Sequence, residues 1–153
     1  MTAYSAKSAI ESLDSGNDDE IGLKVVSSPV CCTGDTDFDL VVKPIGRDCI
    51  FCGLEDTKCL LLAASDNPRA IDPRNAEMLR EKISEFMDGN YCTRIAICGI
   101  ENMLLWSGAR KVAWILKQVD SMMRERGVRG SLFLRGDSIS QEDASILQES
   151  LSL

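Results

Sequence analysis

The order of strand and helix patterns in the second half of the sequence constrains the fold more than any other feature. Apolar runs without alternation at 59–63 and 94–98 are typical of strands covered on both faces. Apolar residues then recur at helical spacing over 76–87, 112–123 and 144–151, and a short aliphatic strand pattern at 131–134 separates the last two. Alternating strands and helices bury their apolar faces economically as a parallel sheet with right-handed crossovers. We therefore predict an α/β fold with three layers, a mainly parallel sheet and helices on both faces.

Capping residues set the limits of the predicted helices. Asp72 followed by Pro73 predicts a helix start. An Asp side chain can accept hydrogen bonds from the free backbone amides of the first turn, and Pro lacks only an amide hydrogen that has no partner at the first helical position. Gly89 predicts the end of this helix, and Gly127 follows the end of the longest one. Before the last helix, the run 140–143 (Ser-Gln-Glu-Asp) resembles a capping box with Asp in place of Glu.

The N-terminal part of the chain gives different signals. Residues 1–20 are rich in Ser, Asp, Glu and Gly, a composition that cannot offset its ordering entropy by burial, so we predict a flexible acidic arm. Short aliphatic or β-branched runs at 23–26, 38–42 and 58–63 alternate with turn residues and predict strands. At 153 residues with 44% apolar residues the chain has room for one core, so we expect a single domain over 21–153.

Charge argues against two classes of partner. The formal net charge of -7 makes general attraction to nucleic acid or to an anionic membrane unfavourable. The segment 109–135 is the exception, with seven cations and two anions. This basic strip is interpreted as a solvated helix face, and a surface for an anionic partner is the alternative.

The sequence contains no apolar run of the about 20 residues that a transmembrane helix needs. Its N-terminus also lacks the basic and apolar parts of a signal peptide. We therefore expect a cytoplasmic protein, in which the seven cysteines are reduced thiols rather than a disulfide framework.

The cysteines offer the one metal-like pattern in the sequence. A Cys31-Cys32 pair precedes a C-x-x-C motif formed by Cys49 and Cys52. Four converging thiolates could bind zinc, but adjacent residues of an extended strand point to opposite faces, which disfavours the pair as half of a site. Buried structural thiols are favoured, with zinc binding or a redox pair as alternatives. The sequence has no histidine, which excludes His-dependent catalysis and His ligands.

Residues 58–153 resemble an archaeal domain of unknown function that is often attached to sensory modules such as PAS domains. The motifs that carry this resemblance are Ile71-Asp72-Pro73, the run Ile95-Ala96-Ile97-Cys98-Gly99-Ile100-Glu101-Asn102, and Gly108 before an amphipathic helix. That family is similar to RecA-type or KaiC-type ATPase domains, and it usually has Asp where this chain has Cys98. The resemblance implies a degenerate nucleotide-binding fold in which the magnesium-holding acid is missing. The sequence also contains no G-x-x-x-x-G-K-[ST] phosphate-binding motif.

Polar residues follow two of the predicted strands. Glu101 and Asn102 come after the strand at 94–98, and Arg135 and Asp137 come after the strand at 131–134. Because parallel strands place ligands outside their carboxyl ends, these four residues are a candidate ligand site. A first-turn acid that stabilises a helix N-terminus is the simpler interpretation of Glu101.

Trp114 is predicted to lie outside the main core. At about 100° per residue it falls roughly 140° from the centre of the apolar stripe of its helix. Trp106 precedes it by one loop. Large exposed aromatic side chains are enriched at interfaces, so these two residues predict a contact surface for a homodimer or a protein partner.

These features together favour a non-catalytic regulatory or signalling module that acts through protein partners or a small bound ligand, with no cofactor. The alternative function is a cysteine-based metal or redox protein, with zinc at Cys31, Cys32, Cys49 and Cys52. A weaker alternative is an enzyme of unrecognised class that uses Glu101.

Overall fold

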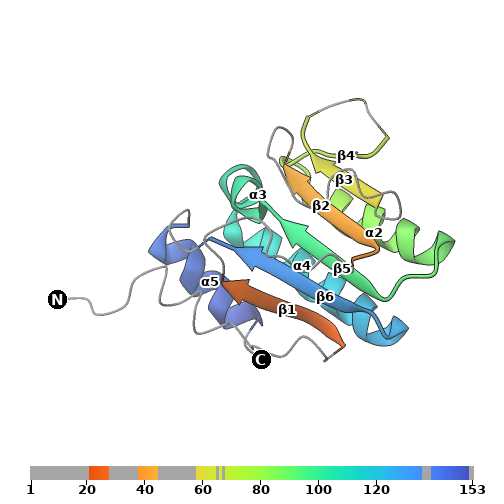
Figure 1. Cartoon of the computed structure of the whole chain (residues 1–153). Helices are drawn as coiled ribbons and strands as arrows, with labels where there is room; N and C mark the ends of the chain where they lie inside the picture. The colour runs from red at the N-terminus through yellow and green to blue at the C-terminus, as the bar shows by residue number, and fades with distance from the viewer. Residues whose placement is uncertain are drawn as a thin grey trace.

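The structure, a computed structural model, describes residues 21–27, 38–44, 58–64, 66, 68–135 and 139–151. Figure 1 shows these residues as one sheet with helices packed against it. The elements in chain order are β1 (Gly22–Ser27), β2 (Leu40–Pro44), β3 (Lys58–Leu62), β4 (Ala70–Ile71), α2 (Glu77–Gly89), β5 (Arg94–Cys98), α3 (Ile100–Ser107), α4 (Ala109–Arg126), β6 (Arg129–Leu134) and α5 (Gln141–Leu151). The predicted flexible arm, residues 1–20, lies outside the described residues.

The sheet has six strands in the order β1-β6-β5-β2-β3-β4, and every pair of neighbours is parallel. The prediction of an α/β fold with a parallel sheet is therefore confirmed. The central pair is β2 and β5, where Leu40 lies opposite Ile95 and Val42 opposite Ile97. All carboxyl ends of the strands consequently lie at one edge of the sheet and all amino ends at the other.

The two faces of the sheet carry separate apolar clusters. The larger cluster contains Leu40, Val42 and the other strand residues of that face, and the buried side chains of α2, α3, α4 and α5 all belong to it. The smaller cluster, on the opposite face, consists of Phe38, Val41, Ala96, Cys98 and Phe133. This alternation along the strands follows from their two-residue period. All four helices that the structure describes therefore cover the same face, and no described helix covers the face of the smaller cluster.

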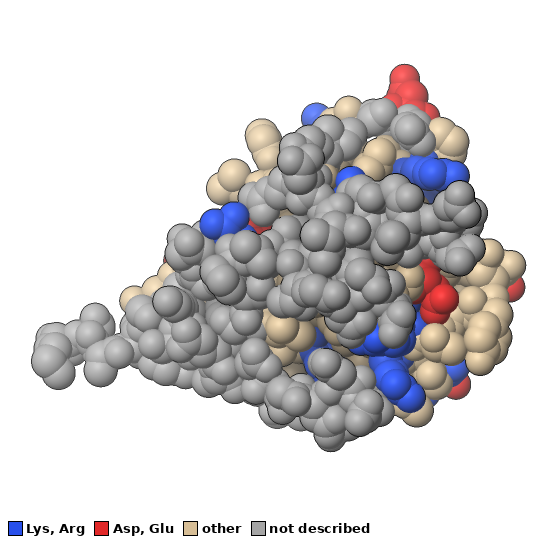
Figure 2. Space-filling view, viewed as in Figure 1, with Lys and Arg blue, Asp and Glu red and all other residues tan. Residues whose placement is uncertain are grey.

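An aromatic contact fixes the smaller cluster. The rings of Phe38 and Phe133 pack edge to face with 6.2 Å between their centroids, and the guanidinium of Arg94 lies 4.7 Å above the Phe38 ring. Figure 2, viewed from this side, shows Lys and Arg side chains in several separate groups intermixed with Asp and Glu. The described side chains visible from this side thus form no continuous basic surface.

The predicted start of the first helix is wrong by several residues. Helix α2 begins at Glu77, after Ala76, and has no side-chain cap. Asp72 instead accepts hydrogen bonds from the backbone amide and the guanidinium of Arg74, at 2.9 to 3.0 Å. These hydrogen bonds hold the pKa of the Asp72 carboxyl below its usual range. Asp72 therefore closes a turn between the short strand β4 and the helix.

The other predicted helix limits are confirmed. Helix α4 ends at Gly127, which has a φ of 69° and donates its amide hydrogen toward the carbonyls of the last turn. The Ser140 hydroxyl oxygen accepts the amide hydrogen of Asp143 at 3.1 Å, which is the first half of the expected capping box. None of the helices in the described part of the chain is both long enough and apolar enough to cross a membrane.

Candidate functional site

At the centre of the carboxyl edge, where an α/β sheet would place a ligand, the described residues of β2 and β5 pack closely against each other. The strand order reverses between β2 and β5, and such a switch point normally opens a crevice at the carboxyl ends of the two strands. Gly99 follows β5 there with a φ of 79°, and an ideal Cβ atom on it would lie 2.2 Å from Cγ of Pro44, the last residue of β2. Ile100 and Met103, which follow on α3, are fully buried. The pyrrolidine ring of Pro44 thus occupies the space directly next to Gly99.

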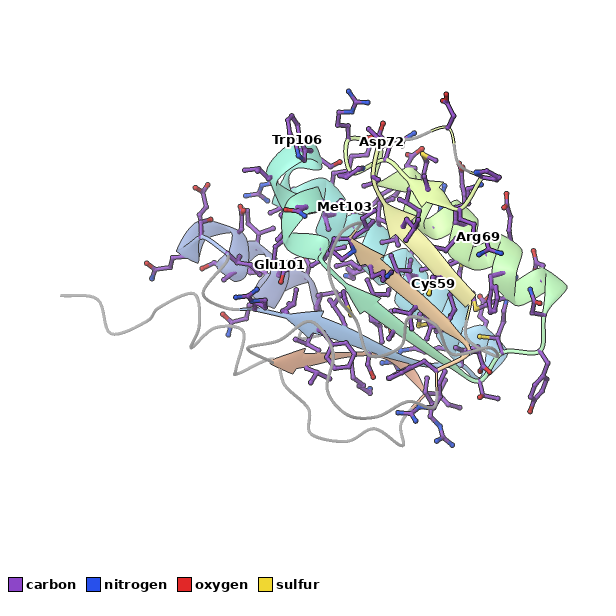
Figure 3. All side chains as sticks on the ribbon, turned by 45° about the horizontal axis from the view of Figure 1, so that its top comes forward. Cys59, Arg69, Asp72, Glu101, Met103 and Trp106 are labelled. Carbon is purple, nitrogen blue, oxygen red and sulfur yellow. The ribbon has the colours of Figure 1, made fainter. Side chains whose placement is uncertain are left out.

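Glu101 and Arg135 are brought together, as the sequence predicted for the ends of neighbouring strands. Glu101 lies in the first turn of α3, and its Oε1 accepts the backbone amide hydrogen of Arg135 at 3.0 Å. Its second oxygen, Oε2, is also buried, as is Nε of Arg135. Figure 3 shows Glu101 between the start of α3 and the end of β6. The carboxylate therefore ties the end of β6 to the start of α3.

The other two residues of the candidate ligand site do not join this contact. Asn102 is exposed on α3, and its backbone amide donates to the carbonyl of Gly99 at 3.2 Å. Asp137 lies outside the described residues. Of the four predicted ligand-site residues, the described part of the chain thus brings together only Glu101 and Arg135.

The aromatic residues of α3 and α4 are exposed, as predicted for Trp114. Trp106 is 64% exposed, Trp114 is 53% exposed, and Leu105 beside Trp106 is 78% exposed. We call Leu105, Trp106 and Trp114 the aromatic surface. Figure 3 shows Trp106 projecting away from the body of the protein at the end of α3, while Met103 on the same helix points into it.

The aromatic surface has a fixed local geometry. The Ser107 hydroxyl donates a hydrogen bond to the Pro73 carbonyl at 2.6 Å, which holds the end of α3 against the turn before α2. From Trp106 to Trp114 the chain passes through Ser107, the single linker residue Gly108 and the first turns of α4, so the two Cα atoms lie at most about 18 Å apart. A standard interface buries about 800 Å² on each partner, which is wide enough to include both side chains.

Three cations surround Trp114 on the exposed face of α4. Arg110, Lys111 and Lys117 are all exposed and lie one helical turn from Trp114. The first acid on this helix is Asp120, whose Oδ1 accepts the backbone amide hydrogen of Leu23 at 2.7 Å and whose carboxylate pairs with Arg124 at 3.0 Å. Asp120 therefore binds the start of β1 and pairs with Arg124. The exposed face of α4 around Trp114 carries three cations and no acid of this helix.

Sequence reasoning missed a polar cluster at the amino edge. Oδ2 of Asp39 accepts hydrogen bonds from the Thr93 amide, the Thr93 hydroxyl and the Arg94 amide, at 2.8 to 3.1 Å. Burial, and after it the charge of Asp39, raises the pKa of the nearby Cys92 thiol to about 11. Cys92 is therefore a poor nucleophile at neutral pH. No local motif marks Asp39, because its partners are more than fifty residues away in the sequence.

The candidate metal ligands Cys31, Cys32, Cys49 and Cys52 all lie outside the described residues, so the zinc or redox alternative stays a prediction. Among the residues that the structure describes, no group of three or more His, Cys, Asp and Glu side chains could hold a metal ion. The described cysteines are Cys59, Cys92 and Cys98, and Cys98 is fully buried.

Comparison with known proteins assigns no family to this chain. No protein-family model matches the sequence, and neither a curated protein nor a solved structure matches it. The resemblance to an archaeal domain that is often attached to sensory modules therefore stays a prediction.

Proposed function

We propose that this chain is a non-catalytic regulatory or signalling module that acts through protein–protein contacts, with the aromatic surface of α3 and α4 as its contact site. The observation that carries this proposal is the exposure of Trp106 and Trp114, by 64% and 53%, on two consecutive helices. Trp is the residue type most enriched among side chains that dominate binding energy at interfaces. A chain that keeps two of them exposed to water within about 18 Å of each other has apolar surface suited to a partner.

The charge of α4 supports an acidic partner surface. Arg110, Lys111 and Lys117 would surround the site where Trp114 is buried on binding. Charged residues around an apolar anchor raise the association rate and the selectivity for a complementary partner. The remainder of this chain is acidic, since the net charge of the whole is -7, so a second copy offers such surfaces as well as a different protein does.

Two features support the non-catalytic part of the proposal. The Glu101 carboxylate, the acid predicted to face a ligand, accepts a backbone hydrogen bond from Arg135. Pro44 fills the space next to Gly99 at the centre of the carboxyl edge. Hydrolysis of a nucleoside triphosphate by the purified chain with magnesium would overturn this part of the proposal.

Site-specific photocrosslinking tests the contact surface. A photoreactive benzoylphenylalanine is introduced at Trp114 and, as a matched control, at Tyr91, which is 91% exposed and lies in the loop between α2 and β5. After irradiation in the native host, position 114 should give discrete crosslinked products, at twice the mass of the chain for a homodimer and at another mass for a different partner. Position 91 should give none. Crosslinks at both positions alike, or at neither, would contradict the proposal.

A further inference from the structure

A recess of about 290 Å³ lies at the amino edge of the sheet, between the starts of β2 and β3 and the second half of α2. Its apolar walls come from three side chains of the main core or packed against it, namely Leu40, Leu60 and Phe86. Pockets that hold small organic molecules begin at about this volume. The recess is therefore large enough for one small molecule.

Charged side chains stand at the rim of this recess. Arg69 and Lys82 supply two cations, and Glu85 supplies one anion. Nζ of Lys82 lies 4.0 Å from Oε2 of Glu85, so the single acid lies beside a cation of the same helix. Figure 3 shows Arg69 beside α2 and Cys59, another lining residue, at the start of β3. Among the described lining residues, the rim thus carries one more cation than acid above apolar walls.

One carbonyl at the end of α2, beside the recess, already accepts a side-chain hydrogen bond. The last carbonyls of a helix normally attract cations and repel anions. Here the Asn90 side-chain amide, which also lines the recess, donates a hydrogen bond to the Phe86 carbonyl at 3.0 Å. One of the terminal carbonyls therefore already has a donor, which reduces its effect on a ligand.

We propose that this recess binds a small amphipathic organic anion, such as an aromatic or branched aliphatic carboxylate. The apolar body packs on Leu40, Leu60 and Phe86, and the carboxylate lies at the rim beside Arg69 and Lys82. No lining residue belongs to α3 or α4, so this site is independent of the aromatic surface and of the function proposed for it. It is also separate from the carboxyl edge, where the sequence predicts a ligand.

Two probes of nearly equal shape test the site in the full-length chain. The anion 4-(trifluoromethyl)benzoate and its neutral counterpart 4-(trifluoromethyl)benzamide are titrated and followed by fluorine NMR. The benzoate should bind saturably and about five-fold more tightly than the benzamide, which is the size expected for one exposed ion pair.

The substitution Arg69→Gln removes one rim charge at an exposed position and should weaken benzoate binding about five-fold while leaving benzamide binding unchanged. Arg129→Gln, a substitution at an exposed position of β6, should change neither. Circular dichroism verifies that both variants fold as the wild type does. Equal affinity for the two probes, equal effects of the two substitutions, or no saturable binding would each overturn the proposal.

Discussion

The substitution Gly99→Ala tests whether the centre of the carboxyl edge is filled. The new methyl group would sit 2.2 Å from Pro44 Cγ and 2.6 Å from Pro44 Cδ, and both atoms belong to a rigid ring at the end of β2. Forcing an extra methyl group into a packed site costs about 1–3 kcal/mol. The left-handed backbone of Gly99, with a φ of 79°, costs an alanine about 1–2 kcal/mol more. We therefore expect the free energy of unfolding to fall by about 2–5 kcal/mol.

Gly127→Ala is the matched control. Gly127 has nearly the same backbone, with a φ of 69°, but nothing lies within 4 Å of its ideal Cβ position. Only the backbone cost of about 1–2 kcal/mol should remain there. Urea unfolding followed by circular dichroism measures both variants, and the excess loss for Gly99→Ala is the cost of the contact with Pro44.

A double-mutant cycle isolates that contact. Pro44→Ala removes the two ring atoms nearest to the new methyl group, so Gly99→Ala should cost at least about 1 kcal/mol less in this background than in the wild type. The reasoning fails if Gly99→Ala costs no more than Gly127→Ala, or if Pro44→Ala leaves its cost unchanged. Either result would mean that the edge has room for a ligand at Gly99.

Three further predictions concern single side chains. Glu101→Ala removes the acceptor of the partly buried Arg135 amide hydrogen and should lower the free energy of unfolding by about 1.5–3 kcal/mol in a urea titration. Glu101→Gln keeps an acceptor oxygen and should lower it by less than half as much. Since the pKa of the Cys92 thiol is raised to about 11 from 9.0, its thiolate fraction at pH 8 is about 100-fold lower in the native chain than in denaturant. Because a thiolate of higher pKa is also more nucleophilic, alkylation by iodoacetamide should be about ten-fold slower in the native chain, and equal rates would refute the assignment. The purified chain should contain no stoichiometric zinc by elemental analysis, while zinc that is lost in Cys49→Ser would favour the metal alternative over the proposed function.

The fold was largely predictable because its elements repeat simple periods. Strand β5 and helix α4 follow from an apolar run and from a helical stripe closed by Gly127, and both depend only on neighbouring residues. The start of α2 was not predicted correctly. The signal at Asp72 is equally local, but its carboxylate accepts hydrogen bonds from Arg74 instead of from the first turn of a helix. The two-residue strand β4 is too short to produce any period.

The candidate site was predictable only in part, for a related reason. Helix geometry alone places Trp114 away from the core, and strand direction alone places Glu101 at the carboxyl edge. What these residues contact depends on segments far apart in the sequence. The hydrogen bond from Arg135 to Glu101 spans 34 residues, and the contact of Pro44 with Gly99 joins two strands that only the sheet order makes neighbours.

The identity of the residue that ends β2 determines what the described part of the carboxyl edge offers to a ligand. Parallel sheets bind anions at a switch point through backbone amides that follow the central strands. Pro44 has no amide hydrogen to donate, and its ring occupies the space against Gly99 that a bound group would need. Pro44 therefore offers no amide donor of its own, and its ring packs closely against Gly99. A recess at the amino edge and an exposed aromatic surface on α3 and α4 are then the places where the described chain still offers apolar area and positive charge together.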